Sequence, residues 1–237
     1  MSIASDFFNP TILSSFAFLV ATLILVHITI KNLSLKNKKI SIKISFFIAL
    51  FLLAWFVIVF FIGRKGFFAK NPFVAPFIFI GFIFLFGILQ KLYTNEKIKK
   101  IFQAMPQHWL IGIQLYRIVG IGFIFLYMQG ELPATFAFSA GIGDMIVGFS
   151  APLVAYFYYK QKPHAQKLAV LWNIIGILDL VLAIGIGIIG FPRPIQLVPV
   201  SPSTEQLSLF PLMIVPLFAV PLALFLHFCG LKALRKK

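Results

Sequence analysis

The stretch ISFFIALFLLAWFVIVFFI, residues 44–62, runs for nineteen residues without one ionisable side chain. A helix of this length rises about 28 Å and matches the hydrocarbon core of a bilayer. A transmembrane strand needs only about ten residues of alternating polarity, and nothing in this stretch alternates. The stretch therefore predicts a membrane-spanning α-helix.

Six further stretches have the same apolar character and the length that a bilayer demands of a helix. The seven predicted spans are 11–30, 44–62, 73–90, 109–128, 138–159, 168–190 and 209–231. The third is the shortest, and Pro72 and Pro76 fall in its entry turn, where a helix tolerates proline. These spans predict an all-α fold: a polytopic membrane protein with a bundle of about seven transmembrane helices, in a single domain over residues 1–237.

The composition argues against several other classes of protein. Hydrophobic residues make up 60% of the 237 residues and charged residues only 11%, whereas soluble domains are about 25% charged. We therefore expect the lipid bilayer to be the main partner of the chain. The single cysteine, Cys229, excludes an internal disulfide and a cysteine-based metal cluster, and we expect no metal and no cofactor. The net charge of +15 does not indicate a nucleic-acid partner, because the basic residues lie at the ends of apolar spans.

The basic residues predict the orientation of the spans, because short cytoplasmic loops retain lysine and arginine. Of the 21 basic residues, sixteen fall on one side of the membrane, four on the other, and Arg117 lies within a span. The sixteen are Lys31, Lys36, Lys38, Lys39, Lys43, Lys91, Lys97, Lys99, Lys100, Lys160, Lys162, Lys167, Lys232, Arg235, Lys236 and Lys237. The other side carries Arg64, Lys65, Lys70 and Arg193, with the acids Asp6, Glu131 and Glu205. We predict an exterior N-terminus, a cytoplasmic C-terminus and an uncleaved first span, in a cell membrane. The bias towards Phe, Ile and Lys suits a bacterial inner membrane.

Three ionisable residues lie inside the predicted spans: Arg117, Asp144 and Asp179. A charge near the middle of a bilayer costs ~3 kcal/mol on insertion scales, so such residues normally face the interior of a bundle and pair. One arginine and two aspartates leave one carboxylate uncompensated. Counting from the predicted span ends puts Asp179 about 4 Å, and Asp144 about 9 Å, from the depth of Arg117. We therefore expect Arg117 to pair with Asp179, and Asp144 to be the free acid.

Helical spacing places the two aspartates on faces made of small residues, at intervals of three and four. Small residues let helices approach closely, so these faces are predicted to pack against neighbouring helices. The predicted packing positions are Gly141, Gly148, Gly176 and Gly187. The predicted buried polar site consists of Arg117, Asp144, Asp179 and Gln114, and Gln114 shares a face of the fourth span with the arginine.

Two kinds of function remain open for this site. Proton-linked or small-solute passage fits the uncompensated carboxylate, and its ligand would be a small molecule or an ion. A structural ion cluster, which locks three helices in register in a structural or partner-binding membrane component, fits the same residues. Passage predicts that water reaches the carboxylates, whereas a structural role predicts a dry, fully paired cluster. Neither role requires catalysis, and we assign no catalytic residue.

Residues 141–144 read G-I-G-D within a predicted span. They resemble the G-x-G-D signature of the intramembrane aspartyl proteases, the presenilin and signal-peptide-peptidase kind. The resemblance implies a catalytic Asp144 that shares a proton with a second aspartate on a neighbouring helix, here Asp179. In presenilin-type members the partner precedes the G-x-G-D helix, whereas Asp179 follows it, and Pro-Leu-Ala-Leu at 221–224 stands in place of a Pro-Ala-Leu motif. A protease predicts adjacent acids, with Arg117 remote.

Two histidines and three prolines are the remaining candidates. His27 and His227 lie near the inner ends of the first and last spans. We expect them to be interfacial side chains, without a haem or metal between them. Pro211, Pro216 and Pro221 predict a repeatedly kinked last span, and we expect this bent helix to face lipid.

Polar and aromatic residues recur around the charged positions of the fourth to sixth spans. They are Gln114, Tyr116, Arg117, the run 141–144, Trp172, Asn173 and Asp179, with the region 107–151 around the first of them. Together they resemble an uncharacterised family of bacterial membrane proteins, over roughly the C-terminal half of the chain. The resemblance implies no activity.

Overall fold

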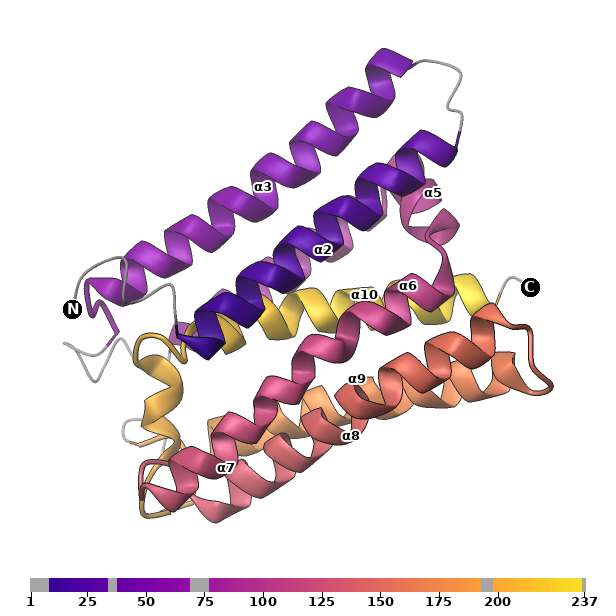
Figure 1. Cartoon of the computed structure of the whole chain (residues 1–237). Helices are drawn as coiled ribbons and strands as arrows, with labels where there is room; N and C mark the ends of the chain where they lie inside the picture. Colours follow the sequence, from indigo (N-terminus) through magenta and orange to yellow (C-terminus); the bar gives the residue numbers. More distant parts are fainter. Residues whose placement is uncertain (1–8, 34–37, 69–76, 193–197, 236–237) are drawn as a thin grey trace.

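The computed structural model describes residues 9–33, 38–68, 77–192 and 198–235, and in these ranges every regular element is a helix (Figure 1). The elements are α2 (Pro10–Asn32), α3 (Lys38–Arg64), α4 (Phe77–Tyr93), α5 (Glu96–Ala104), α6 (Gln107–Gly112), η1 (Ile113–Gly120), α7 (Ile121–Met128), α8 (Ala134–Tyr159), α9 (Ala165–Ile189), η2 (Thr204–Ser208), η3 (Val215–Ala219) and α10 (Val220–Leu234). The predicted all-α fold class is confirmed.

Six helical segments within the described ranges are long and apolar enough to cross a membrane. They are Pro10–Lys31, Ile42–Arg64, Gln107–Met128, Ala134–Tyr159, Ala165–Ile189 and Val215–Leu234. A seventh span results if α4 and α5, which meet at an angle of 97°, are counted as one broken span. The predicted count of about seven is confirmed in this form. Pro72 and Pro76 lie outside the described residues.

The helix α5 was not anticipated by the sequence analysis, which left residues 91–108 as a loop. Asn95 caps this helix, because its side chain accepts hydrogen bonds from the backbone N–H groups of Lys97 and Ile98. One face of the short helix buries Ile101 and Phe102 against the bundle. The chain therefore continues beyond the apolar α4 as an amphipathic helix, which runs in a new direction across the end of the bundle.

The fourth predicted span changes its helix type in the middle. It begins as α6, continues as the 3₁₀-helix η1 and ends as α7. In a 3₁₀-helix, side chains three residues apart lie directly above one another. Gln114, Arg117 and Gly120 therefore form one row, and all three are buried. This local geometry holds the arginine on the inner face of the span.

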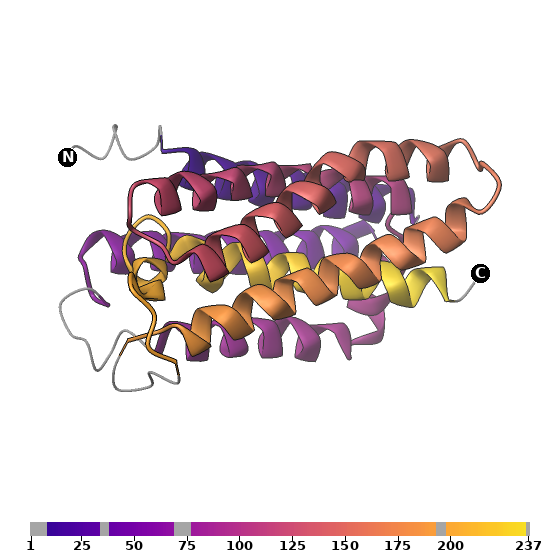
Figure 2. The ribbon, with the colours of Figure 1, turned by 90° about the horizontal axis from the view of Figure 1, so that it is seen from below.

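The last span lies in the middle of the bundle, as Figure 2 shows for α10. Within its most apolar window 83% of the residues are buried, against 28–39% in the other five long segments. The prediction of a lipid-facing last helix is therefore wrong. Pro221 has no N–H to donate to the carbonyl of Leu217 one turn earlier, and the indole Nε1 of Trp55 donates to that carbonyl instead, at 2.9 Å. A side chain of the neighbouring helix α3 thus provides the hydrogen bond that the proline cannot, so the last span has to pack against α3 at this point.

The bundle has two ends, and they differ in the chain segments that form them (Figures 1 and 2). One end holds the beginning of α2 at Asn9, the connection between α7 and α8, and the segment that leads into α10. The opposite end holds the turn between α8 and α9 at Gln161, the helix α5 and the end of α10. We call them the Asn9 end and the Gln161 end.

Candidate functional site

Arg117 lies between two carboxylates from two different helices. Its Nε donates to Oδ1 of Asp144 on α8 at 2.7 Å, and its Nη2 donates to Oδ2 of Asp179 on α9. The arginine side chain is only 1% exposed. The expected pairing with Asp179 is present, but the expectation that Asp144 is a free acid is wrong. A single guanidinium joins η1, α8 and α9, and we call these three side chains the Arg117 cluster.

The length of α8 explains why Asp144 was misplaced. The sequence analysis began this span at residue 138, whereas α8 begins at Ala134 and puts Asp144 ten residues from the Asn9 end of the helix. The four extra residues bring the carboxylate about 6 Å deeper. The 3₁₀ segment that precedes Arg117 rises about 2 Å per residue and shifts the arginine in the opposite direction. The two corrections together remove the predicted difference in depth.

His227 on α10 completes the hydrogen bonding of the guanidinium. Nη1 of Arg117 lies 3.3 Å from Nε2 of His227, and Nδ1 of His227 lies 3.0 Å from Oδ1 of Asn173 on α9. An arginine can only donate, so Nε2 must accept and Nδ1 carries the proton that is donated to Asn173. The amide Nδ2 of Asn173 donates in turn to the carbonyl of Ala169 at 2.8 Å. The histidine in this arrangement is neutral, and it positions the arginine.

The sequence analysis missed the role of His227. It treated His227 as an interfacial residue like His27, yet His27 is exposed whereas His227 is 1% exposed. The error follows from placing α10 at the lipid surface. One signal was available: Trp172 and Asn173 belong to the residues that resemble a family, and both contact this histidine, Trp172 with its ring centroid 5.1 Å from the imidazole.

The four predicted packing glycines all face a neighbouring segment. A Cβ at Gly148 would lie 2.7 Å from the backbone nitrogen of Ile118, and one at Gly141 would lie 3.0 Å from the carbonyl oxygen of Gly120. On α9, Gly176 faces the imidazole of His227 and Gly187 faces Leu207 at 3.2 Å. A contact with backbone cannot be relieved by rotating a side chain. The helix α8 therefore approaches η1 closely only because Gly141 and Gly148 have no side chain.

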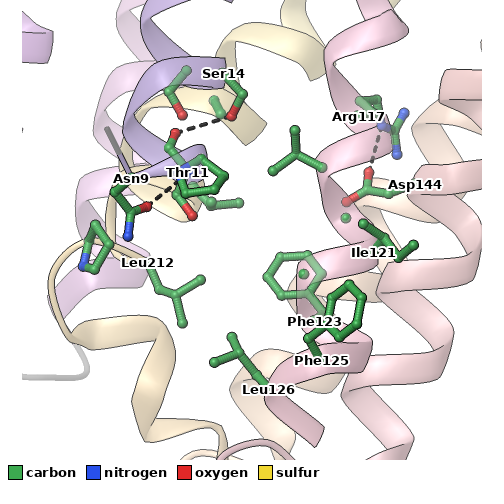
Figure 3. Close-up of a pocket in the computed structure, with 18 of the residues that line it drawn as sticks. Asn9, Thr11, Ser14, Arg117, Ile121, Phe123, Phe125, Leu126, Asp144 and Leu212 are labelled. Atoms are coloured by element: carbon green, nitrogen blue, oxygen red, sulfur yellow. Dashed lines mark hydrogen bonds and ion pairs between the residues drawn. The ribbon is translucent and has the colours of Figure 1, made fainter. Parts of the chain in front are cut away.

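A cavity of about 720 Å³ lies between α2 and the η1–α7 segment and reaches the Arg117 cluster (Figure 3). Polar groups of Asn9, Thr11 and Ser14 line one wall, and apolar side chains such as Phe123 line the other. Its volume is in the range of small-molecule sites. The Asp144 side chain, which lines the cavity, is 17% exposed, whereas Arg117 is almost fully enclosed. The carboxylate is therefore the part of the cluster that a ligand in the cavity can reach.

The Arg117 cluster does not have the arrangement of an aspartyl protease. Two catalytic aspartates must lie side by side to share one proton. Here the guanidinium of Arg117 lies between Asp144 and Asp179 and pairs with both. An adjacent cation favours the ionised form of each acid, so the pair has no reason to share a proton. Across the described part of the chain, no group of three or more His, Cys, Asp or Glu side chains could hold a metal ion.

Gln114 is fully buried beside this cluster, and neither polar atom of its side chain has a hydrogen-bond partner among the described residues. The sequence analysis placed it on the arginine face, and the structure puts it there, one 3₁₀ turn towards the Gln161 end. An unpartnered buried amide is uncommon in native proteins.

Comparison with known proteins gives one match. A family model described as a domain of unknown function (DUF8737) matches residues 72–235. No curated protein and no solved structure matches the chain. The matched range is longer than the C-terminal half from which the resemblance was inferred, and it includes all four residues Arg117, Asp144, Asp179 and His227. The helices α2 and α3 precede it.

Proposed function

We propose a function for this chain from the chemistry of its Arg117 cluster. The chain belongs to the DUF8737 family of domains of unknown function. The chain is a multi-pass membrane protein that binds a proton or a small cationic solute at Asp144 and lets it pass through the bundle. The Asn9 end faces the exterior and the Gln161 end the cytoplasm, in keeping with the distribution of lysine and arginine. The membrane is a bacterial inner membrane.

The observation that supports this function is the cavity that leads to Asp144. A purely structural ion cluster gains nothing from access to solvent, because water weakens the attraction between charges. Here about 720 Å³ of space extends from the hydroxyl groups of Thr11 and Ser14 to a carboxylate that helices otherwise enclose. An ionisable residue at depth that borders such a space is typical of ion and proton pathways.

The charges around the cavity favour a cation over an anion. One guanidinium and two carboxylates carry a net charge of −1 when all are ionised, and Glu131 adds a further carboxylate to the cavity lining. Aromatic rings also bind cations through their negative faces. Phe123 and Tyr116 both line the cavity. A proton or a small ammonium ion fits this lining, whereas an anion would meet an uncompensated carboxylate.

The test compares two carboxylate-to-amide substitutions in protein reconstituted into liposomes. Methylammonium, choline and a pH step are applied as probes, and uptake and the unfolding temperature are measured. We expect Asp144→Asn to abolish the uptake and the ligand-induced rise in unfolding temperature, because the amide keeps the shape but has no charge. Glu205→Gln is the matched control, since Glu205 does not line the cavity and should behave as the wild type. If no probe gives a response that depends on Asp144, passage of a cation is ruled out.

The orientation has its own test in reporter fusions. A reporter that works only in the cytoplasm is joined after Lys237, and one that works only in the periplasm is joined after Glu131. Both are expected to be active. Activity of the opposite reporter at either position would reverse the proposed orientation.

A structural or partner-binding role is the second candidate, and the double pairing of Arg117 supports it. Both acids pair with the arginine, and His227 occupies its remaining nitrogen. In this case Asp144→Asn lowers the unfolding temperature, through the lost ion pair, and no probe distinguishes the variant from the wild type. The experiment described above therefore separates the two candidates.

A further inference from the structure

The buried face of the fourth span continues beyond Arg117 towards the Gln161 end. Gln114 and Gln107 lie on it, with 0% and 6% of their surface exposed. Among the residues that the structure describes, neither the Oε1 nor the Nε2 atom of either side chain has a hydrogen-bond partner. Leaving such a group unsatisfied is costly, and nearly all buried polar groups in proteins find a partner. These amides must therefore be satisfied by partners other than the described residues.

The side chains of Gln107 on α6 and Asn173 on α9 approach the same point on α10. A Cβ at Gly230 of α10 would lie 3.1 Å from Oδ1 of Asn173 and 3.4 Å from Oε1 of Gln107. The two oxygens thus lie close to one another beside the glycine, where a methyl group would crowd both of them. Oδ1 of Asn173 already accepts a hydrogen bond from His227 but has a second lone pair. Two acceptors around one small space are typical surroundings of a buried water.

The row of polar groups from Gln107 to Arg117 covers about half the length of the fourth span. Gln107 is the first residue of α6, and Arg117 follows Gln114 by three positions in η1. The axial distance from Gln107 to Arg117 is about 17 Å, if α-helical and 3₁₀ rises are combined. The row therefore extends from the Gln161 end of the fourth span to the Arg117 cluster, on the side opposite to the cavity.

We propose that a file of buried water molecules joins the Arg117 cluster to the Gln161 end. The side chains that line this file are Gln107, Gln114, Asn173 and His227. Water donates to the amide oxygens and accepts from the amide nitrogens, which supplies the missing partners. The contact between Arg117 and His227, at 3.3 Å, separates this file from the cavity. The presence of water in this file does not depend on the proposed function. Its role as the second half of a passage rests on the proposed function, in which an ion crosses when the contact between Arg117 and His227 opens.

Hydroxyl-radical labelling measures this hydration directly, because radicals formed from buried water label the side chains beside it. The labelling rate of each residue is determined by mass spectrometry on the purified wild-type protein in nanodiscs. His227 and Trp172 are 1% and 5% exposed, and we expect both to be labelled nevertheless. Phe218, which is 0% exposed and is not among the residues that line the file, should remain unlabelled.

Two glycine substitutions make the measurement specific. Gly230→Ala places a methyl group 3.1 Å from Oδ1 of Asn173 and 3.4 Å from Oε1 of Gln107, which crowds the acceptors of the proposed water, and the labelling of His227 and Trp172 should fall several-fold. Gly185→Ala is the control, because nothing lies within 4 Å of the added methyl group, and it should leave the labelling unchanged. Should Gly230→Ala fail to fold, Gln107→Met removes the polar atoms at nearly constant volume and should lower the labelling in the same way.

The outcomes distinguish the water file from the proposed function. Labelling of His227 at the low level of Phe218, or equal labelling in the wild type, Gly230→Ala and Gln107→Met, would overturn the water file. Binding of methylammonium from the cavity should persist in Gly230→Ala while its uptake falls, since Gly230 does not line the cavity. A labelled His227 in a protein that takes up no cation would leave the water file in place and refute passage.

Discussion

The helix α2 and the segments around Arg117 both bury polar side chains, but they satisfy them in different ways. Thr22 and Thr29 of α2 are 1% and 2% exposed, and each hydroxyl donates to a carbonyl four residues earlier in its own helix. Arg117, in contrast, has partners on α8, α9 and α10. A group satisfied within its own helix is indifferent to its neighbours. A charge satisfied across helices fixes their positions, so the two regions should respond very differently to substitution.

The largest effect is expected at Arg117. Arg117→Leu leaves two carboxylates buried without a cation and should destabilise the bundle by about 3–5 kcal/mol. Removing Asp179 as well still leaves Asp144 uncompensated, because both acids pair with the arginine. Only the triple replacement Arg117→Leu, Asp144→Leu and Asp179→Leu removes every charge and should restore most of the stability. Unfolding in SDS titrations ranks the three proteins, and a triple variant no better than the single one would contradict the cross-helix description.

A smaller effect is expected from crowding the contact between α8 and η1. Gly148→Leu places a side chain against the backbone of Ile118 and should cost about 1–3 kcal/mol through overpacking. The adjacent Phe149 is 59% exposed, and Phe149→Leu should be nearly neutral. Thermal unfolding in the same detergent compares the two. The opposite ranking would mean that this face of α8 does not pack as described.

The buried His227 and the exposed His27 allow the same substitution to be compared in two surroundings. His227→Leu leaves Oδ1 of Asn173 without its hydrogen bond from the histidine and Nη1 of Arg117 with only the carbonyl of Gly176, at 3.5 Å, and should cost about 1–3 kcal/mol. His27→Leu changes an exposed side chain and should stay within about 0.5 kcal/mol. Differential scanning fluorimetry can resolve this difference. Equal losses at the two positions would show that His227 does not support the arginine.

The smallest effect is expected for the hydroxyl groups of α2. Thr22→Val removes a hydrogen bond to the carbonyl of Phe18 but keeps the side-chain shape, and the change in stability should be within about 0.5 kcal/mol. Urea or SDS unfolding of this variant and of Arg117→Leu compares the smallest expected loss of stability with the largest. A large loss would indicate that the hydroxyl contacts another helix or a ligand.

The helix α2 nevertheless contributes to the candidate site in a way that its sequence did not suggest. The first three spans hold few polar residues at depth, and none of the predicted site residues lies in them. The beginning of α2 supplies Asn9, Thr11 and Ser14 to the cavity wall opposite Arg117. Farther along, Phe18 stacks on Tyr116 with ring centroids 4.0 Å apart. The cavity therefore combines a segment inside the family match with one that precedes it.

The sequence by itself determined the helical class, the approximate spans and the three charged residues that had to face inwards. Each follows from a strong and local constraint: a long apolar run has to avoid water, and a charge at depth has to find a partner. The residue-level resemblance likewise pointed to the range in which a family model matches. Such constraints act on each segment separately, so no knowledge of its neighbours was needed.

Only the tertiary structure decided which side chains meet. Span ends read from a sequence carry an error of about three residues, or ~4.5 Å along a helix, which exceeds the range of an ion pair. The pairing of Asp144 with Arg117 was lost within that error. Apolar residues suit lipid and protein interior equally, so composition could not show that α10 is central and that its His227 reaches the arginine. The cavity and the unpartnered amides depend on how whole helices diverge and approach, which no single segment encodes.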